Sequence, residues 1–179
     1  PISSGLVLDL DAGSSKSYPG SGNTWYDLST SRISANIANS PTYSSNNVGY
    51  LTFSGANSQS VNTNSTFSSV LSINLPITFE VIAYINLSGN DETLIGNSFS
   101  DGGVLIRKTS TNTVRALYFS GGLNFMGWDS SVLSSSGWYH VISTYNGSGV
   151  SSNNFNLYVN SKLANTTRSE EHTSELQSH

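Results

Sequence analysis

Trp128 and Asp129 are the neighbouring residues in this sequence whose side chains are best suited to bind a sugar. They lie in the run of residues 125–130, which we expect to form a loop. A sugar ring stacks its apolar face on an indole, and its hydroxyl groups hydrogen-bond to a carboxylate. The pair therefore predicts a ligand-binding site for carbohydrate, with burial of Trp128 in the core as an equally weighted alternative.

The other carboxylates do not form the pattern of a glycosidase. Such enzymes need two acids about 5 to 9 Å apart, and a strand motif such as Glu-x-Asp-x-x-Glu would supply them; the sequence contains none. Asp91 and Glu92, beside Asn90, are interpreted as a solvated turn. Asp9 and Asp11 share one face, interpreted as an exposed strand edge. We therefore predict no catalytic residues and a protein that is not an enzyme.

His140 is the one histidine that precedes the last twelve residues of the chain. It lies beside Trp138 in a predicted strand. A lone histidine in such a place is more often a packing or hydrogen-bonding residue than a general acid or base. We therefore interpret His140 as a packing or hydrogen-bonding residue.

The residues that must position these side chains have the composition of a β protein. Apolar residues are mainly Ile, Val, Leu, Tyr and Phe, and Ser, Thr, Asn and Gly dominate the rest. Residues 77–86 are apolar at every odd position, so they predict a half-buried strand with Glu80 on the face away from the core. Further strands are predicted at residues 6–10, 50–53, 93–95, 104–107, 114–119, 138–145 and 155–159, and near Val61, which would form a hairpin with residues 50–53.

Composition also excludes several classes of partner. Charged residues make up 10% of the chain and the formal net charge is −4, so no basic patch is present to bind nucleic acid. No apolar stretch reaches the roughly 20 residues of a membrane helix, and we predict no membrane insertion. The chain has no cysteine, so its fold relies on core packing without disulfides.

Three segments resemble the signature of a known family of β-sandwiches. Residues 137–141 read Gly-Trp-Tyr-His-Val, residues 145–147 read Tyr-Asn-Gly, and residues 157–160 read Leu-Tyr-Val-Asn. This order is similar to the W-Y-H-V, Y-x-G, L-Y-V-N signature of laminin-G-like domains in the concanavalin A-like superfamily. Residues 77–81 are similar to the inner-strand segment of that family, and the N-terminal segments 8–13, 18–22 and 24–29 resemble members of viral and environmental origin.

The resemblance implies a two-sheet antiparallel β-sandwich of the jelly-roll type, displayed outside the cell, at the cell surface or on a virion. Related pentraxin-like members place metal ligands before the strand that corresponds to residues 104–107, and Asp101 lies there in this chain. Asp101 is therefore the candidate metal ligand, with calcium as the candidate ion and a plain turn as the alternative. The family also continues with a closing strand, so we expect one or two strands to be missing.

The last twelve residues, Arg168 to His179, differ sharply from the sequence before them. They hold three of the eleven acidic residues and two of the three histidines. Their sequence, RSEEHTSELQSH, resembles a widely used sequencing adapter translated in frame. We therefore predict a laminin-G-like domain over residues 1–167 and a non-native tail over residues 168–179 that does not pack on it.

Three functions are consistent with these patterns, and fold alone does not choose among them. The first is a non-catalytic carbohydrate-binding or adhesion module that recognises a glycan or cell-surface polysaccharide, within an oligomer of a larger assembly. The second is a purely structural decoration domain. The third is the accessory part of a glycoside hydrolase whose catalytic residues lie outside this chain.

Overall fold

The computed structural model describes residues 4–55, 58–63, 75–96, 103–119, 125–149 and 151–170. These residues form antiparallel sheets, so the predicted all-β class is confirmed. The chain divides into two compact units, residues 1–70 and 71–179. The single domain predicted over residues 1–167 stays a prediction. The described residues include no helix long and apolar enough to cross a membrane.

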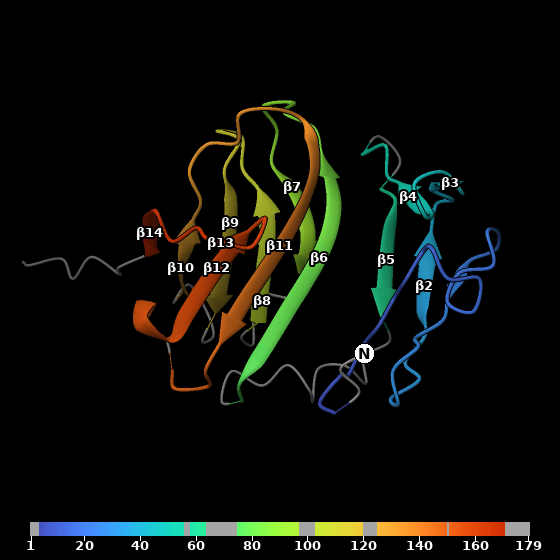
Figure 1. The fold of residues 1–179 in the computed structure, drawn as a ribbon, viewed down its shortest axis with the longest axis horizontal. Coiled ribbons are helices and arrows are strands. Elements are labelled where there is room, and N and C mark those ends of the chain that lie inside the picture. The colour runs from blue at the N-terminus through green and yellow to red at the C-terminus, as the bar shows by residue number, and fades with distance from the viewer. Residues whose placement is uncertain are drawn as a thin grey trace, which may run out of the picture. The chain divides into compact units, whose positions relative to one another are not determined.

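The N-terminal unit contains two small sheets (Figure 1). One has the order β1-β2-β5, and the other is the hairpin β3-β4. Their bounds are β1 Thr24–Trp25, β2 Ala35–Ala38, β3 Thr42–Ser44, β4 Tyr50–Thr52 and β5 Ser60–Thr63. Tyr18, Ala35 and Ile37 form its buried apolar positions.

Two predictions for this unit are wrong. Residues 6–10 are not a strand. The backbone of Asp9 is instead hydrogen-bonded to Asp27 and Leu28, because Asp9 N donates to Asp27 Oδ1 and Leu28 N donates to Asp9 O. The predicted hairpin is also absent, because β4 pairs with β3 while β5 pairs with β2. Strands β2 and β3, which were not predicted from the sequence, supply both partners.

The C-terminal unit holds a five-stranded and a four-stranded antiparallel sheet (Figure 1). Their strand orders are β14-β10-β9-β8-β7 and β13-β12-β11-β6. The bounds are β6 Ile77–Ile85, β7 Glu92–Gly96, β8 Gly103–Lys108, β9 Val114–Phe119, β10 Phe125–Asp129, β11 Gly137–Tyr145, β12 Phe155–Val159, β13 Lys162–Leu163 and β14 Thr167–Glu170. The strands predicted from residue 77 onward are therefore confirmed.

The two sheets of this unit enclose a common core, as in a sandwich. Ile106 and Val114 from the five-stranded sheet cluster with Val141 and Leu157 from the four-stranded sheet, and all four are fully buried. The odd positions of β6 pack against the same cluster, as the alternation predicts. This sheet-on-sheet packing leaves the opposite face of β6 and β11 outward.

A polar and aromatic contact also joins the two sheets. Tyr118 in β9 stacks on Phe155 in β12, with ring centroids 4.3 Å apart. The Tyr118 hydroxyl lies 2.8 Å from Ser143 Oγ in β11. Burial raises the pKa of Tyr118, and the Ser143 hydrogen bond opposes this rise without cancelling it. The Tyr118 hydroxyl therefore stays protonated and links β9 to β11 without carrying a charge.

The prediction of a solvated turn at Asp91 and Glu92 holds in part, because Asp91 is exposed directly after a bend while Glu92 begins β7 and both carboxylates are paired. Asp91 Oδ2 lies 3.2 Å from Arg107 Nη1, and Glu92 Oε1 lies 3.4 Å from Lys108 Nζ. The Lys108 side chain is fully buried, and its ammonium also donates to Ser88 Oγ. The two acids therefore neutralise cations of the neighbouring strand β8.

The start of the predicted tail packs, in contrast to expectation. Residues 168–170 belong to β14, which pairs antiparallel with β10, so that Arg168 lies opposite Trp128. Ladder hydrogen bonds join backbone groups, and an unpaired strand edge accepts any extended segment regardless of its side chains. The tail's unusual composition therefore did not prevent this pairing.

Candidate functional site

The outward surface of β6 and β11 carries Tyr84 and Trp138, the exposed aromatic side chains among the described residues of the C-terminal unit. The strands pair so that Trp138 lies opposite Tyr84 and His140 lies opposite Ile82. Neighbouring positions in a strand point to opposite faces, so these residues share the surface that faces away from the core. We call Glu80, Ile82, Tyr84, Trp138 and His140 the outer face.

The aromatic part of the outer face is open to solvent. Ile82 is 67% exposed, Tyr84 is 58% exposed and Trp138 is 44% exposed. The Tyr84 and Trp138 rings meet edge to face, with centroids 5.8 Å apart and planes at 85°. Edge-to-face packing holds two rings in a fixed relation while part of each remains accessible.

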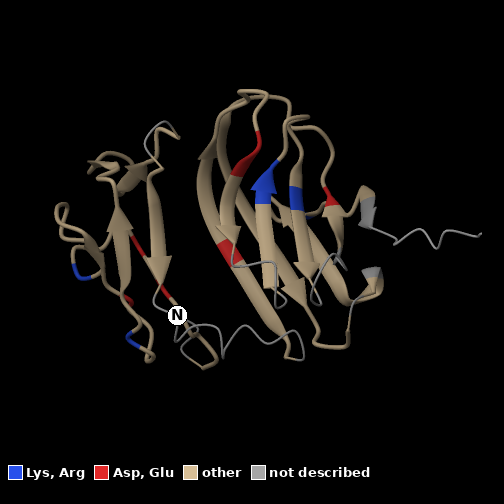
Figure 2. Ribbon diagram, turned by 180° about the vertical axis from the view of Figure 1, so that it is seen from behind, with Lys and Arg blue, Asp and Glu red and all other residues tan. Residues whose placement is uncertain are grey.

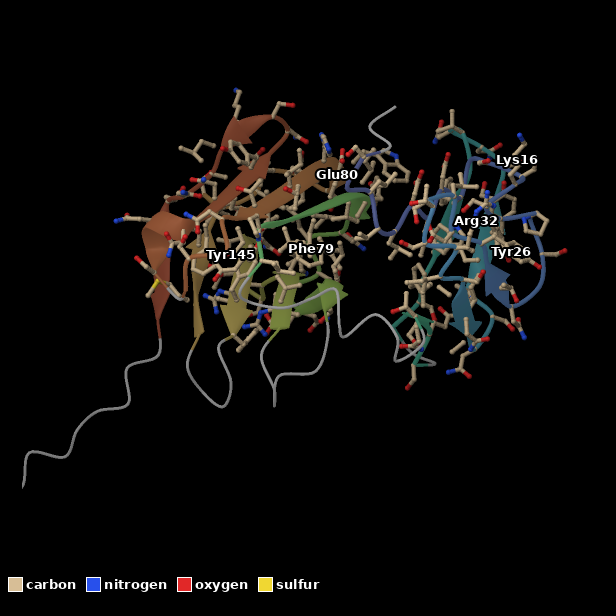
Figure 3. The ribbon with its side chains drawn as sticks, turned by 90° about the horizontal axis from the view of Figure 1, so that it is seen from below. Lys16, Tyr26, Arg32, Phe79, Glu80 and Tyr145 are labelled. Atoms are coloured by element: carbon tan, nitrogen blue, oxygen red, sulfur yellow. The ribbon has the colours of Figure 1, made fainter. Side chains whose placement is uncertain are left out.

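A hydrogen-bonded polar pair lies beside these rings. His140 Nε2 and Glu80 Oε1 are 2.6 Å apart, and the contact runs diagonally because Glu80 lies opposite Ile142 in the ladder. The His140 backbone is held in turn, since its N–H donates to Asn160 Oδ1 at 3.0 Å. Figure 3 shows Glu80 pointing away from β6 on the side opposite Phe79, which packs on the core.

The prediction that His140 is a hydrogen-bonding residue is confirmed by this contact. Glu80 lies on the predicted outward side, but it has a partner that the sequence reading did not assign to it. The pair offers hydroxyl groups of a ligand both an acceptor and a ring nitrogen.

Trp128 and Asp129, the predicted ligand-binding residues, lie in strand β10 and not in a loop. The Trp128 indole packs against both main core clusters, and its Nε1 donates to Phe155 O at 3.2 Å. Asp129 is buried and accepts two hydrogen bonds from Arg115, at 2.6 and 2.7 Å. The hydrogen bond to Asp129 raises the pKa of Arg115 despite the guanidinium's partial burial.

The structure does not bring the Trp128 and Asp129 side chains together on one surface. Adjacent residues of a strand point to opposite faces of the sheet, which is why the indole enters the core and the carboxylate meets Arg115. Their role in ligand binding stays a prediction, and the contacts favour the alternative of core packing for Trp128.

Asp101, the predicted metal ligand, lies outside the described residues. Within the parts of the chain that the structure describes, no three His, Asp or Glu side chains gather in a way that could hold a metal ion. Calcium binding at Asp101 stays a prediction.

The outer face was missed although the sequence carried a signal for it. Ile82 and Tyr84 occupy even positions of residues 77–86, where a solvent-facing strand surface is usually polar. Two large apolar residues on the wet side of a strand indicate a contact surface.

Comparison with known proteins identifies no relative of this chain. No family model matches the chain, and neither the curated proteins nor the solved structures contain a match to it. The function is therefore inferred from the described side chains alone.

Proposed function

We propose that this protein is a non-catalytic carbohydrate-binding or adhesion module, built on a laminin-G-like two-sheet jelly roll, and that the outer face is its binding surface. The partner is a glycan or polysaccharide outside the cell, and the protein is displayed at a cell surface or on a virion. The single observation that carries the proposal is the pair of exposed rings, Tyr84 and Trp138, on one sheet surface.

Exposed aromatic rings suit a sugar chain because the C–H face of a pyranose stacks on a ring without losing the hydration of its hydroxyls. Tyr84 and Trp138 lie on neighbouring strands, and Ile82 extends the apolar surface along β6. Successive outward residues of a strand are about 6.6 to 6.8 Å apart, so the surface runs over more than one sugar ring.

The hydrogen-bonded pair of Glu80 and His140 would orient a bound sugar on the outer face. Glu80 Oε1 and His140 Nε2 are hydrogen-bonded to each other, which fixes both side chains and leaves the second carboxylate oxygen and the second ring nitrogen to contact ligand hydroxyls. One stacking contact and one or two hydrogen bonds give an affinity on the order of micromolar to millimolar. Repetition of the module in an oligomer would raise this affinity through avidity.

The ion pairs of the C-terminal unit support binding without hydrolysis. Glu80, Asp91, Glu92 and Asp129 each contact a cationic or imidazole side chain within the unit. A glycosidase instead needs two carboxyl groups that face the same glycosidic bond. We therefore propose that the described acids have structural and positioning roles.

Replacing Trp138 with alanine should weaken binding of a neutral polysaccharide about fivefold, because one stacking contact of about 1 kcal/mol is lost. Isothermal titration calorimetry with a soluble β-glucan or galactan measures the change. Phe53→Ala is the matched control, because Phe53 is also 44% exposed but lies in the other compact unit.

Equal losses for Trp138→Ala and Phe53→Ala would contradict the assignment of the outer face. Unchanged binding by Trp138→Ala, with the variant still folded by circular dichroism, would contradict it as well.

A purely structural decoration domain is the second candidate, and the packing of Trp128 favours it. The residue that the sequence singled out for stacking on a sugar contacts the core and Phe155 instead. On this alternative the outer face contacts a second protein copy. Self-association that is lost in Tyr84→Ala, together with no binding to any glycan, would identify it.

A further inference from the structure

A second, separate surface feature lies in the N-terminal unit. It is an open pocket of about 620 Å³, lined by Lys16, Tyr26, Asp27, Leu28, Arg32 and Ser34. Figure 3 shows Lys16, Tyr26 and Arg32 on this unit. Its volume is within the usual range for small-molecule sites, about 300 to 1,000 Å³.

Buried Ser17 fixes the side of the pocket that carries Lys16 and Tyr26. Ser17 is fully buried, and its Oγ donates to Tyr26 O at 2.6 Å. Tyr26 N donates in return to Ser17 O at 2.8 Å. Since Lys16 directly precedes Ser17, these two hydrogen bonds hold the backbone of the lysine next to that of the tyrosine. The Tyr26 ring is 49% exposed beside it.

Buried Asp27 fixes the side that carries Arg32. The Asp27 Oδ2 atom accepts from Ile33 N at 2.9 Å, directly after Arg32. Arg32 adopts a left-handed backbone with φ of 53°, a conformation that costs a non-glycine residue about 1 kcal/mol or more. The hydrogen bonds of Asp27 hold this turn, so the guanidinium is presented from a preformed loop.

Two cations and one carboxylate line the pocket, so its lining carries a net positive charge. Asp27 accepts hydrogen bonds from Asp9 N, Ser29 N, Ser29 Oγ and Ile33 N. Burial, and after it the carboxylates of Asp11 and Asp27, raise the pKa of Asp9, and neither Asp9 nor Asp11 lines the pocket. Asp27 therefore offsets one of the two positive charges, but it forms no ion pair with Lys16 or Arg32.

Lys16 and Arg32 also form no ion pair with a described carboxylate. Arg107, Lys108 and Arg115 each pair with a carboxylate. Among the side chains that the structure describes, those of Lys16, Arg32 and Lys162 take part in no ion pair. Figure 2 shows the two cations of the N-terminal unit on its loops, in a chain with few charges.

We propose that this pocket binds an acidic sugar unit, with Lys16 and Arg32 holding its carboxylate or sulfate and Tyr26 contacting its ring. Paired cations recognise such anions by charge-assisted hydrogen bonds, which Arg can make in bidentate form. The inference rests on the proposed function only in taking the ligand to be a saccharide, and it concerns a different surface from the outer face.

The test is calorimetric titration of the full chain with three probes at low salt: oligogalacturonate, sulfated dextran and neutral dextran. The pocket predicts binding of at least one acidic probe, with an affinity that falls as salt is added. A Lys16→Gln, Arg32→Gln double variant should lose at least about tenfold in that affinity, because each charge-assisted hydrogen bond exceeds a neutral one. Carboxylated and sulfated ligands are distinguished by which probe binds.

Lys162→Gln is the matched control, because Lys162 is an exposed cation without an ion pair in the other unit. It should leave the affinity unchanged. Equal loss in Lys162→Gln, unchanged affinity in the Lys16→Gln, Arg32→Gln double variant, equal affinity for inorganic sulfate alone, or no binding of either acidic probe would each overturn the proposal. Circular dichroism confirms that each variant is folded.

Discussion

Replacing Trp128 with alanine should lower the free energy of unfolding of the C-terminal unit by about 3 kcal/mol. The indole packs against residues of both core clusters and donates a hydrogen bond to Phe155 O. Removing it leaves a cavity between the sheets and an unpaired carbonyl. Urea unfolding followed by far-ultraviolet circular dichroism measures the loss.

Trp138→Ala is the matched control for this prediction, because it removes the same side chain from the outer face. Trp138 is 44% exposed, and its loss should change stability by less than about 1 kcal/mol. A stable Trp128→Ala variant would mean that the indole does not support the core, and it would restore Trp128 as a candidate for stacking on a ligand.

Replacing Asp27 with asparagine should destabilise the N-terminal unit by about 2 to 3 kcal/mol. The carboxylate accepts four hydrogen bonds at 2.7 to 2.9 Å, from three backbone N–H groups and the Ser29 hydroxyl. An amide keeps one acceptor oxygen and places an N–H₂ group against donors, so at least two contacts are lost. Asp11→Asn, at an exposed position with one local hydrogen bond, is the control.

The same carboxylate predicts how stability responds to acid. Burial raises the pKa of Asp27, but the hydrogen bonds from residues 29, 9 and 33 outweigh it, so the pKa lies below the ordinary value of 3.8. A group whose pKa is lowered by folding stabilises the protein above its unfolded pKa, and this stability is lost as the pH falls through the folded pKa. Asp9, whose pKa is raised, contributes with the opposite sign.

Unfolding measurements between about pH 5 and pH 2 should therefore show a loss of stability in the original protein that Asp27→Asn does not share. Equal acid sensitivity in both proteins would show that the hydrogen bonds to Asp27 do not stabilise its ionised form.

The strands of the C-terminal unit could be predicted because their alternation is strong. Residues 77–85 and 155–159 place apolar side chains at every second position, and both form strands with that face in the core. The N-terminal unit has no such pattern. Its strand Ala35–Ala38 reads Ala-Asn-Ile-Ala, and its folding depends on hydrogen bonds of buried polar residues such as Asp27, which local sequence does not reveal.

The candidate site was harder to predict for two physical reasons. Gly127 and Asp129 on one face of β10 look like turn residues, so the inward alternation of Met126 and Trp128 was not recognised. Contacts such as Arg115 with Asp129 depend on strand register, because these residues are cross-strand partners in β9 and β10. Register is set by long-range pairing. Ile82 and Tyr84, in contrast, could have been found from their positions alone.

The central claim is that the outer face binds a neutral glycan, and native-gel retardation tests it most directly. The protein is run in gels that contain a soluble neutral polysaccharide, beside a Tyr84→Ala, Trp138→Ala double variant. We expect the original protein to be slowed by at least one polysaccharide and the double variant to migrate as it does in a plain gel. The account would be contradicted if no neutral polysaccharide slowed either protein, or if a polysaccharide slowed both proteins equally.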